Sequence, residues 1–216
     1  MREIGQIIRV QIQPLPIKHG HPQRYDPARL LVVDRLCLTS KGVVGITSAD
    51  EEVMDVHHAQ HSQSRYRGNN AISIGFTSHY DILRAQFGKH MFDGCAGENI
   101  LIQTGAYYTL ADLGQALAIQ NAYTGEFVYL TQPAATEPCV LFCRFALHPW
   151  LPHPRDQIKR TLQFLRHGRR GFYAHVAPTT GQEVIGPGDR VYVLENDELL
   201  QAGVEKERLK KHPVPS

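Results

Sequence analysis

The chain opens with apolar residues at alternating positions. Between residues 4 and 12, isoleucine and valine alternate with arginine and glutamine, and Pro14 and Pro16 follow. Successive side chains of a β-strand point to opposite faces, and proline has no backbone N–H to donate to a sheet. The pattern therefore predicts a long first strand that ends before Pro14.

Short apolar runs bounded by glycine or polar turns continue along most of the chain. This spacing is typical of a strand meander and favours a barrel or a sandwich over alternating strands and helices. The segments that we predict as further strands are residues 30–38, 43–46, 71–74, 100–103, 107–110, 116–120, 126–130, 172–176 and 190–194.

Two segments follow a helical period instead. In residues 80–87 the larger side chains recur three or four positions apart, Thr77 or Ser78 can cap the first turn, and Gly88 follows. Residues 155–166 show the same period, and a glycine follows them closely. We predict a helix at each, so the expected fold class is mainly β with a few helices (α+β).

Three segments lack a sustained apolar period. Residues 18–27, rich in histidine, glycine and proline, predict a loop. Residues 48–70, crowded with histidine and arginine, predict a long loop of the kind that is often functional. Residues 206–216 are charged and then carry prolines, and we expect this polar tail to fray. Residues 1–205 then form a single domain.

The composition argues against several classes of protein. The chain has 216 residues, of which 42% are hydrophobic, enough for one sizeable core. Its 23 lysines and arginines nearly balance 21 acidic residues, unlike a dedicated nucleic-acid binder. The N-terminus has no apolar stretch like that of a signal peptide or a membrane span, so we expect a cytoplasmic protein. The four cysteines are scattered and do not form two pairs that would suggest a zinc site.

The sequence Gly97-Glu98-Asn99 is the first candidate site. Glycine lets the backbone approach a ligand closely, and Glu98 can accept hydrogen bonds from the N–H groups of a planar heterocycle, while Asn99 can donate and accept. Cys95 lies beside this turn and is a candidate second thiol. A tight turn with solvated polar side chains explains the same residues, and the turn alone does not decide between the two.

Cys139, which follows Pro138, is the second candidate. A thiolate is a soft ligand for transition metals and a nucleophile that can carry sulfur as a persulfide, provided that it is exposed and nearby cations lower its pKa. The alternative is a small buried hydrophobe. Cys143 fits that alternative better, because Leu141, Cys143 and Phe145 share a period of two and would face one side of a strand.

The histidine- and arginine-rich loop is the third candidate. His57 and His61 are four positions apart, which suits a metal only on a helix, and no third ligand accompanies them. Imidazole and guanidinium donors, including Arg65, favour a phosphate or another oxyanion instead. A solvated basic loop remains the alternative.

Arg169 and Arg170 form the fourth candidate. They stand just before the predicted strand at 172–176 and can direct positive charge toward a bound anion. A surface turn is the alternative, and the stretch is too short for the interleaved basic and aromatic residues of a nucleic-acid site.

Taken in order, these motifs resemble those of a MOSC-domain protein, the family related to the C-terminal domain of molybdenum cofactor sulfurase. The resemblance extends over most of the chain. It rests on the Gly42-Val43-Val44-Gly45 turn after a Leu-x-Leu strand, the histidine- and arginine-rich loop, Gly97-Glu98-Asn99, Pro138-Cys139, and the segment from 168 to 194 with GRRGFYAHV and GPGDRVYVL.

The resemblance implies a β-barrel-like domain in which Cys139 binds molybdenum or carries sulfur, and Glu98 and Asn99 line the pterin site of the molybdenum cofactor. A pyridoxal-phosphate desulfurase domain has no room in a chain of this size, so no pyridoxal phosphate is expected. One departure concerns the Gly-Asp-x-His run that family members often carry after the glycine turn. Here Asp55-x-His57 comes only after an insertion.

The leading hypothesis is a molybdenum-cofactor-binding protein that reduces N-hydroxylated substrates with electrons from a separate reductase, because no flavin or iron–sulfur motif is present. The alternatives are a non-catalytic carrier that delivers sulfur or cofactor to a molybdoenzyme, and a small-molecule-binding barrel with a buried cysteine. In the leading hypothesis Cys139 is the metal ligand and catalytic thiol, and the turn with Gly97, Glu98 and Asn99 contacts the pterin. The residues expected to hold the cofactor's phosphate are His57, His61, Arg65, Arg169 and Arg170.

Overall fold

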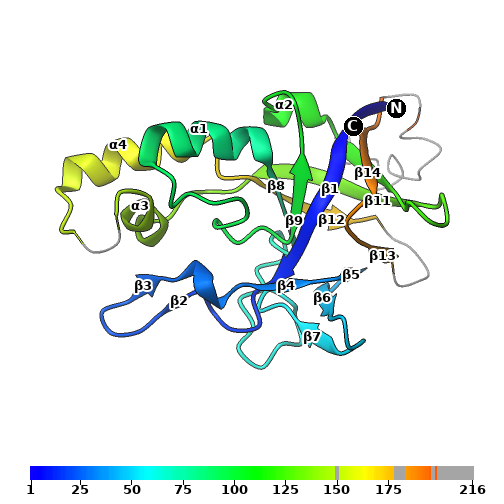
Figure 1. The fold of residues 1–216 in the computed structure, drawn as a ribbon, viewed down its shortest axis with the longest axis horizontal. Coiled ribbons are helices and arrows are strands. Elements are labelled where there is room, and N and C mark those ends of the chain that lie inside the picture. The colour runs from blue at the N-terminus through cyan, green and yellow to red at the C-terminus, as the bar shows by residue number, and fades with distance from the viewer. Residues whose placement is uncertain (149–150, 178–182, 196–197, 199–216) are drawn as a thin grey trace, which may run out of the picture.

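A closed barrel of seven strands forms the centre of the molecule (Figure 1). The computed structural model describes residues 1–148, 151–177, 183–195 and 198. Around the barrel the strand order is β14-β10-β11-β12-β8-β9-β1, and pairing of β1 with β14 closes it. The barrel strands are β1 (Arg2–Ile12), β8 (Ile72–Phe76), β9 (Ile100–Gln103), β10 (Ala116–Gln120), β11 (Phe127–Ala135), β12 (Phe172–Val176) and β14 (Arg190–Val193).

The first strand organises the closure. The N-terminal part of β1 pairs with β14, its middle with β9, and its last residues with β4 (Leu31–Val33), each in antiparallel fashion. Its register shifts between Ile7 and Arg9, which buries Ile7 and leaves Ile8 40% exposed. The prediction of a long opening strand is confirmed, and the bulge explains why its alternation is imperfect.

A smaller sheet and a hairpin adjoin the barrel (Figure 1). The sheet has the order β13 (Glu183–Ile185), β5 (Arg35–Thr39), β6 (Gly42–Ile46) and β7 (Glu52–Met54). The hairpin consists of β2 (Lys18–His19) and β3 (Arg24–Tyr25), and the 3-10 turn Pro27–Arg29 follows it. Two segments predicted as loops therefore contain short strands. The isolated hairpin and β7 lack a long apolar pattern, so their pairing depends on tertiary contacts.

Four helices occur in the described ranges, and three of them lie to one side of the barrel strands in Figure 1. Their bounds are α1 (Thr77–Phe87), α2 (Leu110–Leu113), α3 (Val140–Ala146) and α4 (Arg155–Leu165). The predicted helices correspond to α1 and α4 and are confirmed, but the expected cap by Thr77 or Ser78 is wrong, because Phe76 is the N-cap of α1 and no side chain caps it. The predicted mainly β class with a few helices and a barrel-like architecture is also confirmed.

Two strand predictions were wrong. Residues 107–110 lead into α2, where Thr109 and Asp112 form a reciprocal capping box that a strand could not use. The expected strand through Leu141 and Cys143 is the helix α3, because the Cys139 side chain caps its first turn. The apparent period of two arose by chance within a short helix.

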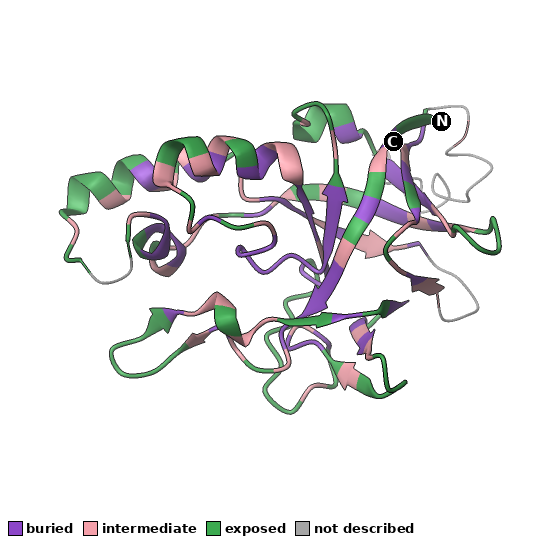
Figure 2. Cartoon of the chain, in the orientation of Figure 1, coloured by how far each residue is buried: buried purple, intermediate pink, exposed green. Residues whose placement is uncertain are grey.

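The buried side chains form two main clusters, and Figure 2 shows buried segments both along the barrel strands and on the helices beside them. The first, here called the barrel core, consists of apolar side chains, among them Ile7, Ile12, Ile72, Phe76, Ile102 and Phe172. The second, the helical core, contains Ile17, Tyr25, Tyr80, Leu83, Met91, Cys95, Ala96, Leu101, Phe142, Cys143, Phe145, Ala146 and Leu165.

No helix in the described ranges is both long enough and apolar enough to cross a membrane. The predicted polar tail, residues 206–216, lies outside the described residues.

Candidate active site around Cys139

Cys139 occupies the N-cap of α3. Its Sγ accepts a hydrogen bond from the backbone N–H of Phe142 at 3.4 Å. The thiol is partly exposed, whereas Cys37, Cys95 and Cys143 are buried. Because the first turn of a helix has unpaired N–H groups and a positive end of its dipole, an N-cap thiol is favoured as the thiolate.

Two cations strengthen that preference. Burial alone would raise the pKa of the Cys139 thiol, but Arg170, Lys18 and the Phe142 N–H outweigh it and lower the pKa below its usual value. Lys18 of β2 is the second of these cations, and its positive charge favours the thiolate. By contrast, burial raises the pKa of Cys143, one helical turn away, to about 12. Of these two thiols, only Cys139 is suited to ligate a metal or to react.

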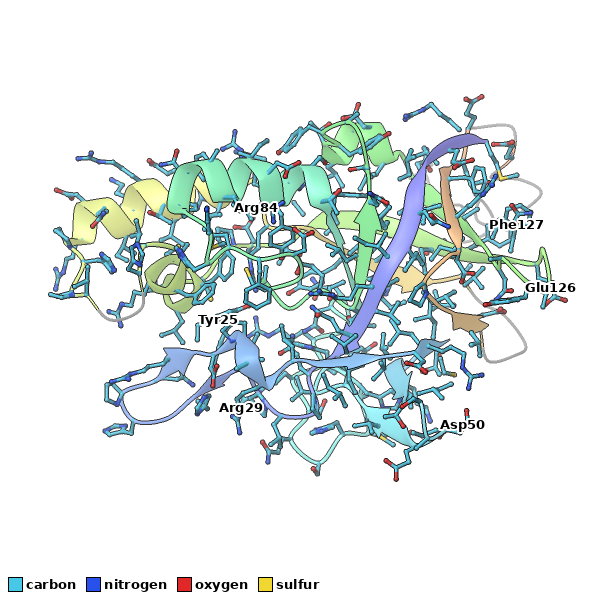
Figure 3. All side chains as sticks on the ribbon, in the orientation of Figure 1. Tyr25, Arg29, Asp50, Arg84, Glu126 and Phe127 are labelled. Atoms are coloured by element: carbon cyan, nitrogen blue, oxygen red, sulfur yellow. The ribbon has the colours of Figure 1, made fainter. Side chains whose placement is uncertain are left out.

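Tyr25 fixes the hairpin that carries Lys18. Its hydroxyl donates to the carbonyl of Cys95 at 2.9 Å. Its ring meets that of Phe142 edge to face, with centroids 5.1 Å apart, and that of Phe145 at 5.3 Å. Tyr25, labelled in Figure 3, thereby packs the hairpin against α3. The β2–β3 hairpin is thus held beside the thiol although it contains only four paired residues.

Arg170 is the other cation that favours the thiolate. Its Nη1 donates to the carbonyl of Glu137 at 3.0 Å, and its Nη2 donates to the carbonyl of Ala96 at 3.3 Å. The guanidinium carbon lies 4.9 Å from the centroid of the Phe142 ring. This cation–π contact and the two hydrogen bonds hold one positive charge between the 93–99 loop and the start of α3.

Glu98 is buried beside this arginine, with only 4% of its surface exposed. The Tyr80 hydroxyl lies 2.7 and 2.9 Å from its two carboxyl oxygens and accepts a hydrogen bond from the Ala96 N–H at 3.0 Å. A Cβ at Gly75 would lie 2.7 Å from Glu98 Oε1, so a glycine there leaves room for the carboxyl group. Burial raises the pKa of Glu98 to about 7, although Tyr80 and Arg170 act against it.

Asn99 connects the turn to the rest of the fold. It is 2% exposed, and its Oδ1 accepts hydrogen bonds from the backbone N–H and the hydroxyl of Ser73. Its Nδ2 donates to the carbonyl of Gln11 and to Asp55 Oδ2. These four contacts use the full hydrogen-bonding capacity of the amide. The structure therefore gives Asn99 a positioning role, and contact with a heterocycle remains a prediction.

Gly97, the first residue of the turn, has φ +88°, in the left-handed region that favours glycine. A Cβ there would lie 2.9 Å from Gln13 Nε2, and the same nitrogen donates to the Gly97 carbonyl at 3.2 Å. The close approach that this glycine allows is to Gln13 of the same protein.

His57 is linked to this turn through Asp55. The buried Asp55 carboxylate accepts hydrogen bonds from the backbone N–H of Gln13 and His57, and its Oδ1 is 2.9 Å from His57 Nδ1. Asp55 Oδ2 also accepts a hydrogen bond from the side-chain amide of Asn99. The His57 side chain is 22% exposed, so Asp55 orients an imidazole that remains accessible.

The other predicted phosphate ligands are dispersed. His61 uses both ring nitrogens locally, toward the Pro14 carbonyl and the Gln63 N–H. Arg65 is exposed. Arg169 donates to the Phe164 carbonyl at 2.6 Å and stacks over that ring, beside a separate cavity of about 400 Å³. Of the two adjacent arginines, Arg170 faces the thiol.

Sequence reasoning missed Lys18, Tyr25 and Tyr80. Lys18 and Tyr25 lie in a segment predicted as a loop, and nothing local signals that they meet α3. Tyr80 carried a weak signal, because it is a polar residue on the apolar face of a predicted helix and a buried tyrosine hydroxyl needs a partner.

The comparisons with known proteins agree with this fold. A family model for the MOSC domain matches residues 55–192, well over half of the chain. The chain belongs to the MOSC domain family. The family is linked to molybdenum cofactor binding.

Two solved structures share this fold at low sequence identity. The YuaD protein from Bacillus subtilis is 12% identical, with a TM-score of 0.56 over 88% of this chain and 96% of that one. A protein described only as hypothetical is 14% identical, with a TM-score of 0.53 over 90% of this chain and 70% of that one. YiiM from Geobacillus stearothermophilus is 17% identical over the whole of this chain and 93% of its own, with a TM-score of 0.43. No curated protein sequence matches the chain significantly.

The donor set of this MOSC domain suits a metal that brings most of its own ligands. Among the described residues there is no group of three or more histidine, cysteine or acidic side chains that could hold a bare metal ion. Cys139 offers one soft thiolate with cations beside it. One protein thiolate fits a metal already chelated by an organic cofactor better than it fits a free ion.

Proposed function

We propose that this MOSC domain binds the molybdenum cofactor through Cys139 and reduces N-hydroxylated substrates in the cytoplasm. The observation that carries the proposal is the Cys139 thiol, which is partly exposed at a helix N-cap and has a pKa that Arg170 and Lys18 lower. A family linked to this cofactor and a site with a single soft ligand support the same assignment.

The residues around the thiol have separate tasks. Cys139 supplies the thiolate ligand, and Lys18 and Arg170 stabilise its negative charge. Tyr25 and Phe142 pack edge to face in the helical core, against which the partly buried Cys139 also packs. His57, oriented by Asp55, is an accessible donor for an anionic part of the cofactor.

When bound, the cofactor supplies two-electron redox chemistry. The overall reaction converts R–NH–OH to R–NH₂ and water and consumes two electrons and two protons. The electrons come from a separate reductase in this proposal, because the sequence carries no flavin or iron–sulfur motif.

The first experiment measures molybdenum and pterin in the full chain expressed in a host that makes the cofactor. We expect near-stoichiometric molybdenum in the wild type and a loss of about tenfold or more in Cys139→Ser. Cys143→Ala is the matched control, since this thiol lies one helical turn away and is buried. Molybdenum retained by Cys139→Ser, or absent from the wild type, would contradict the proposal.

A carrier is the second candidate function, and the same partly exposed thiol favours it. A low-pKa thiolate can hold sulfur as a persulfide without any redox turnover. Turnover of an N-hydroxylated base with an artificial electron donor supports the enzyme. Lack of turnover by loaded protein, together with transfer of cofactor or sulfur to an apo-molybdoenzyme, supports the carrier.

A further inference from the structure

A cavity of about 400 Å³ lies where three segments that are distant in the sequence meet. They are the segment that leads into α2, the end of β11 at Ala135, and the turn between α4 and β12. Neither Cys139 nor the two cations that favour its thiolate line this cavity. Its volume lies within the range of small-molecule binding sites.

Tyr107 gives the cavity an aromatic wall. Its ring stacks on that of the buried His79 of α1, with centroids 4.4 Å apart and an angle of 23° between the planes. His79 Nε2 lies 2.9 Å from the carbonyl of Tyr108, a contact that fixes the backbone beside Tyr107. Because His79 covers one face of the Tyr107 ring, the other face is left for a ligand, and Tyr107 remains 37% exposed.

His79 also connects this wall to the turn between α4 and β12. Its ring meets the buried Phe172 ring edge to face at 5.9 Å. Gly168 of the turn has φ +86°, and a Cβ there would lie 2.3 Å from the Phe172 ring, so both the backbone conformation and the space require glycine. Two buried rings therefore hold the aromatic wall and the turn in place relative to one another.

The cavity has an excess of positive charge. Arg166, His167 and Arg169 of the turn line it, and none of its lining residues is acidic. No ion pair within the described ranges involves either arginine. Arg169 is held by its stack on Phe164 and by a hydrogen bond to the Phe164 carbonyl, which uses one of the five N–H groups of the guanidinium. Two arginines without a carboxylate partner favour an oxyanion.

We propose that this cavity binds an organic anion in which an aromatic ring carries a carboxylate or a phosphate group. The ring stacks on Tyr107 and contacts Leu110 and Ala135. The oxyanion accepts hydrogen bonds from Arg166 and Arg169. The inference goes beyond the proposed function and does not rest on it, because the cavity is lined by other residues than those that surround the thiol.

The test titrates the full chain with phenyl phosphate and with benzoate and follows the backbone amide signals by NMR. We expect either aromatic anion to shift the signals of residues 107–111 and 166–169 until they saturate. Inorganic phosphate and benzyl alcohol each lack one half of the ligand and should bind about tenfold more weakly or less. The tighter of the two aromatic anions identifies the head group. If neither gives saturable shifts in these residues, or if inorganic phosphate binds as tightly as phenyl phosphate, the proposal is overturned.

Arg166→Gln tests the charged side of the cavity. Arg166 is exposed, so its replacement should preserve the fold, and the affinity for the tighter aromatic anion should fall by about tenfold. Arg155→Gln is the matched control, because this residue is exposed at the other end of α4 and the change in net charge is the same. Equal losses of affinity in the two variants would show that the anion responds to the net charge of the protein, and the proposal would fail.

Tyr107→Leu tests the aromatic wall. The loss of the stacking face should weaken the binding of phenyl phosphate by about fivefold and leave the binding of inorganic phosphate unchanged. An unchanged affinity for phenyl phosphate would overturn the assignment of an aromatic ligand. None of these measurements requires molybdenum, so a protein that binds no molybdenum would contradict the proposed function without deciding this one.

Discussion

The barrel core and the helical core differ in what they bury. The barrel core consists of apolar side chains. The helical core also encloses two tyrosines and two cysteines, and it adjoins the buried Glu98. Buried polar groups are costly unless they are hydrogen-bonded, and here both tyrosine hydroxyls are. We therefore expect the barrel to dominate stability and the polar groups of the helical side to act on the thiol.

The largest effect is expected from a cavity in the barrel core. Ile72 is fully buried, so Ile72→Ala should lower the free energy of unfolding by about 4 kcal/mol. Urea denaturation measures the change. Val32→Ala, at a mostly exposed position of β4, is the control and should change stability by less than about 0.5 kcal/mol. Similar losses in the two variants would remove the distinction between core and edge.

On the helical side, the contribution of Glu98 to the free energy of unfolding should instead depend on pH. The pKa of Glu98 rises on folding to about 7 from its ordinary value of 4.5, so the folded state binds this proton more tightly. The contribution of Glu98 to stability is then present below about pH 4.5 and is lost as pH rises through about 7. Glu98→Gln should therefore gain roughly 3 kcal/mol relative to the wild type at about pH 8 and little at about pH 4.5. Urea denaturation at the two pH values would contradict this if the difference between the variants were constant.

Replacement of Arg170 should change the reactivity of the Cys139 thiol more than it changes the structure of the protein. Arg170→Gln removes a charge that lowers the pKa of Cys139. Alkylation of Cys139 near neutral pH should slow by about tenfold, the effect of one pKa unit. Arg169→Gln is the matched control, because that arginine stacks on Phe164 instead. Equal slowing in the two variants would show that the two arginines are not functionally distinct.

Lys18 should have the smallest of these effects. Its charge also lowers the pKa of Cys139, but Arg170 contributes more. Lys18→Met should slow alkylation near neutral pH by about threefold. Lys41→Met, in the turn between β5 and β6, should leave the rate unchanged. If Lys18→Met slowed alkylation more than Arg170→Gln does, Lys18 rather than Arg170 would be the cation that lowers the pKa of Cys139 most.

The sequence predicted the barrel better than the site, for physical reasons. Strand alternation and helical spacing reflect local burial, so β1, α1 and α4 could be anticipated. Cys139 and Glu98 could also be singled out from their motifs as candidates, and their roles stay predictions. The placement of Lys18 near the thiol could not be anticipated, because it depends on a hairpin held in place by Tyr25. The separation of Arg169 from Arg170 likewise depends on the turn before β12.

Protection of Cys139 by molybdenum tests the account most directly. Full-length preparations with different molybdenum contents are treated briefly with iodoacetamide, and unmodified Cys139 is quantified by mass spectrometry. We expect the protected fraction of Cys139 to equal the molybdenum occupancy, since a metal-bound thiolate is not free to be alkylated. If Cys139 is modified equally whatever the molybdenum content, it is not the metal ligand.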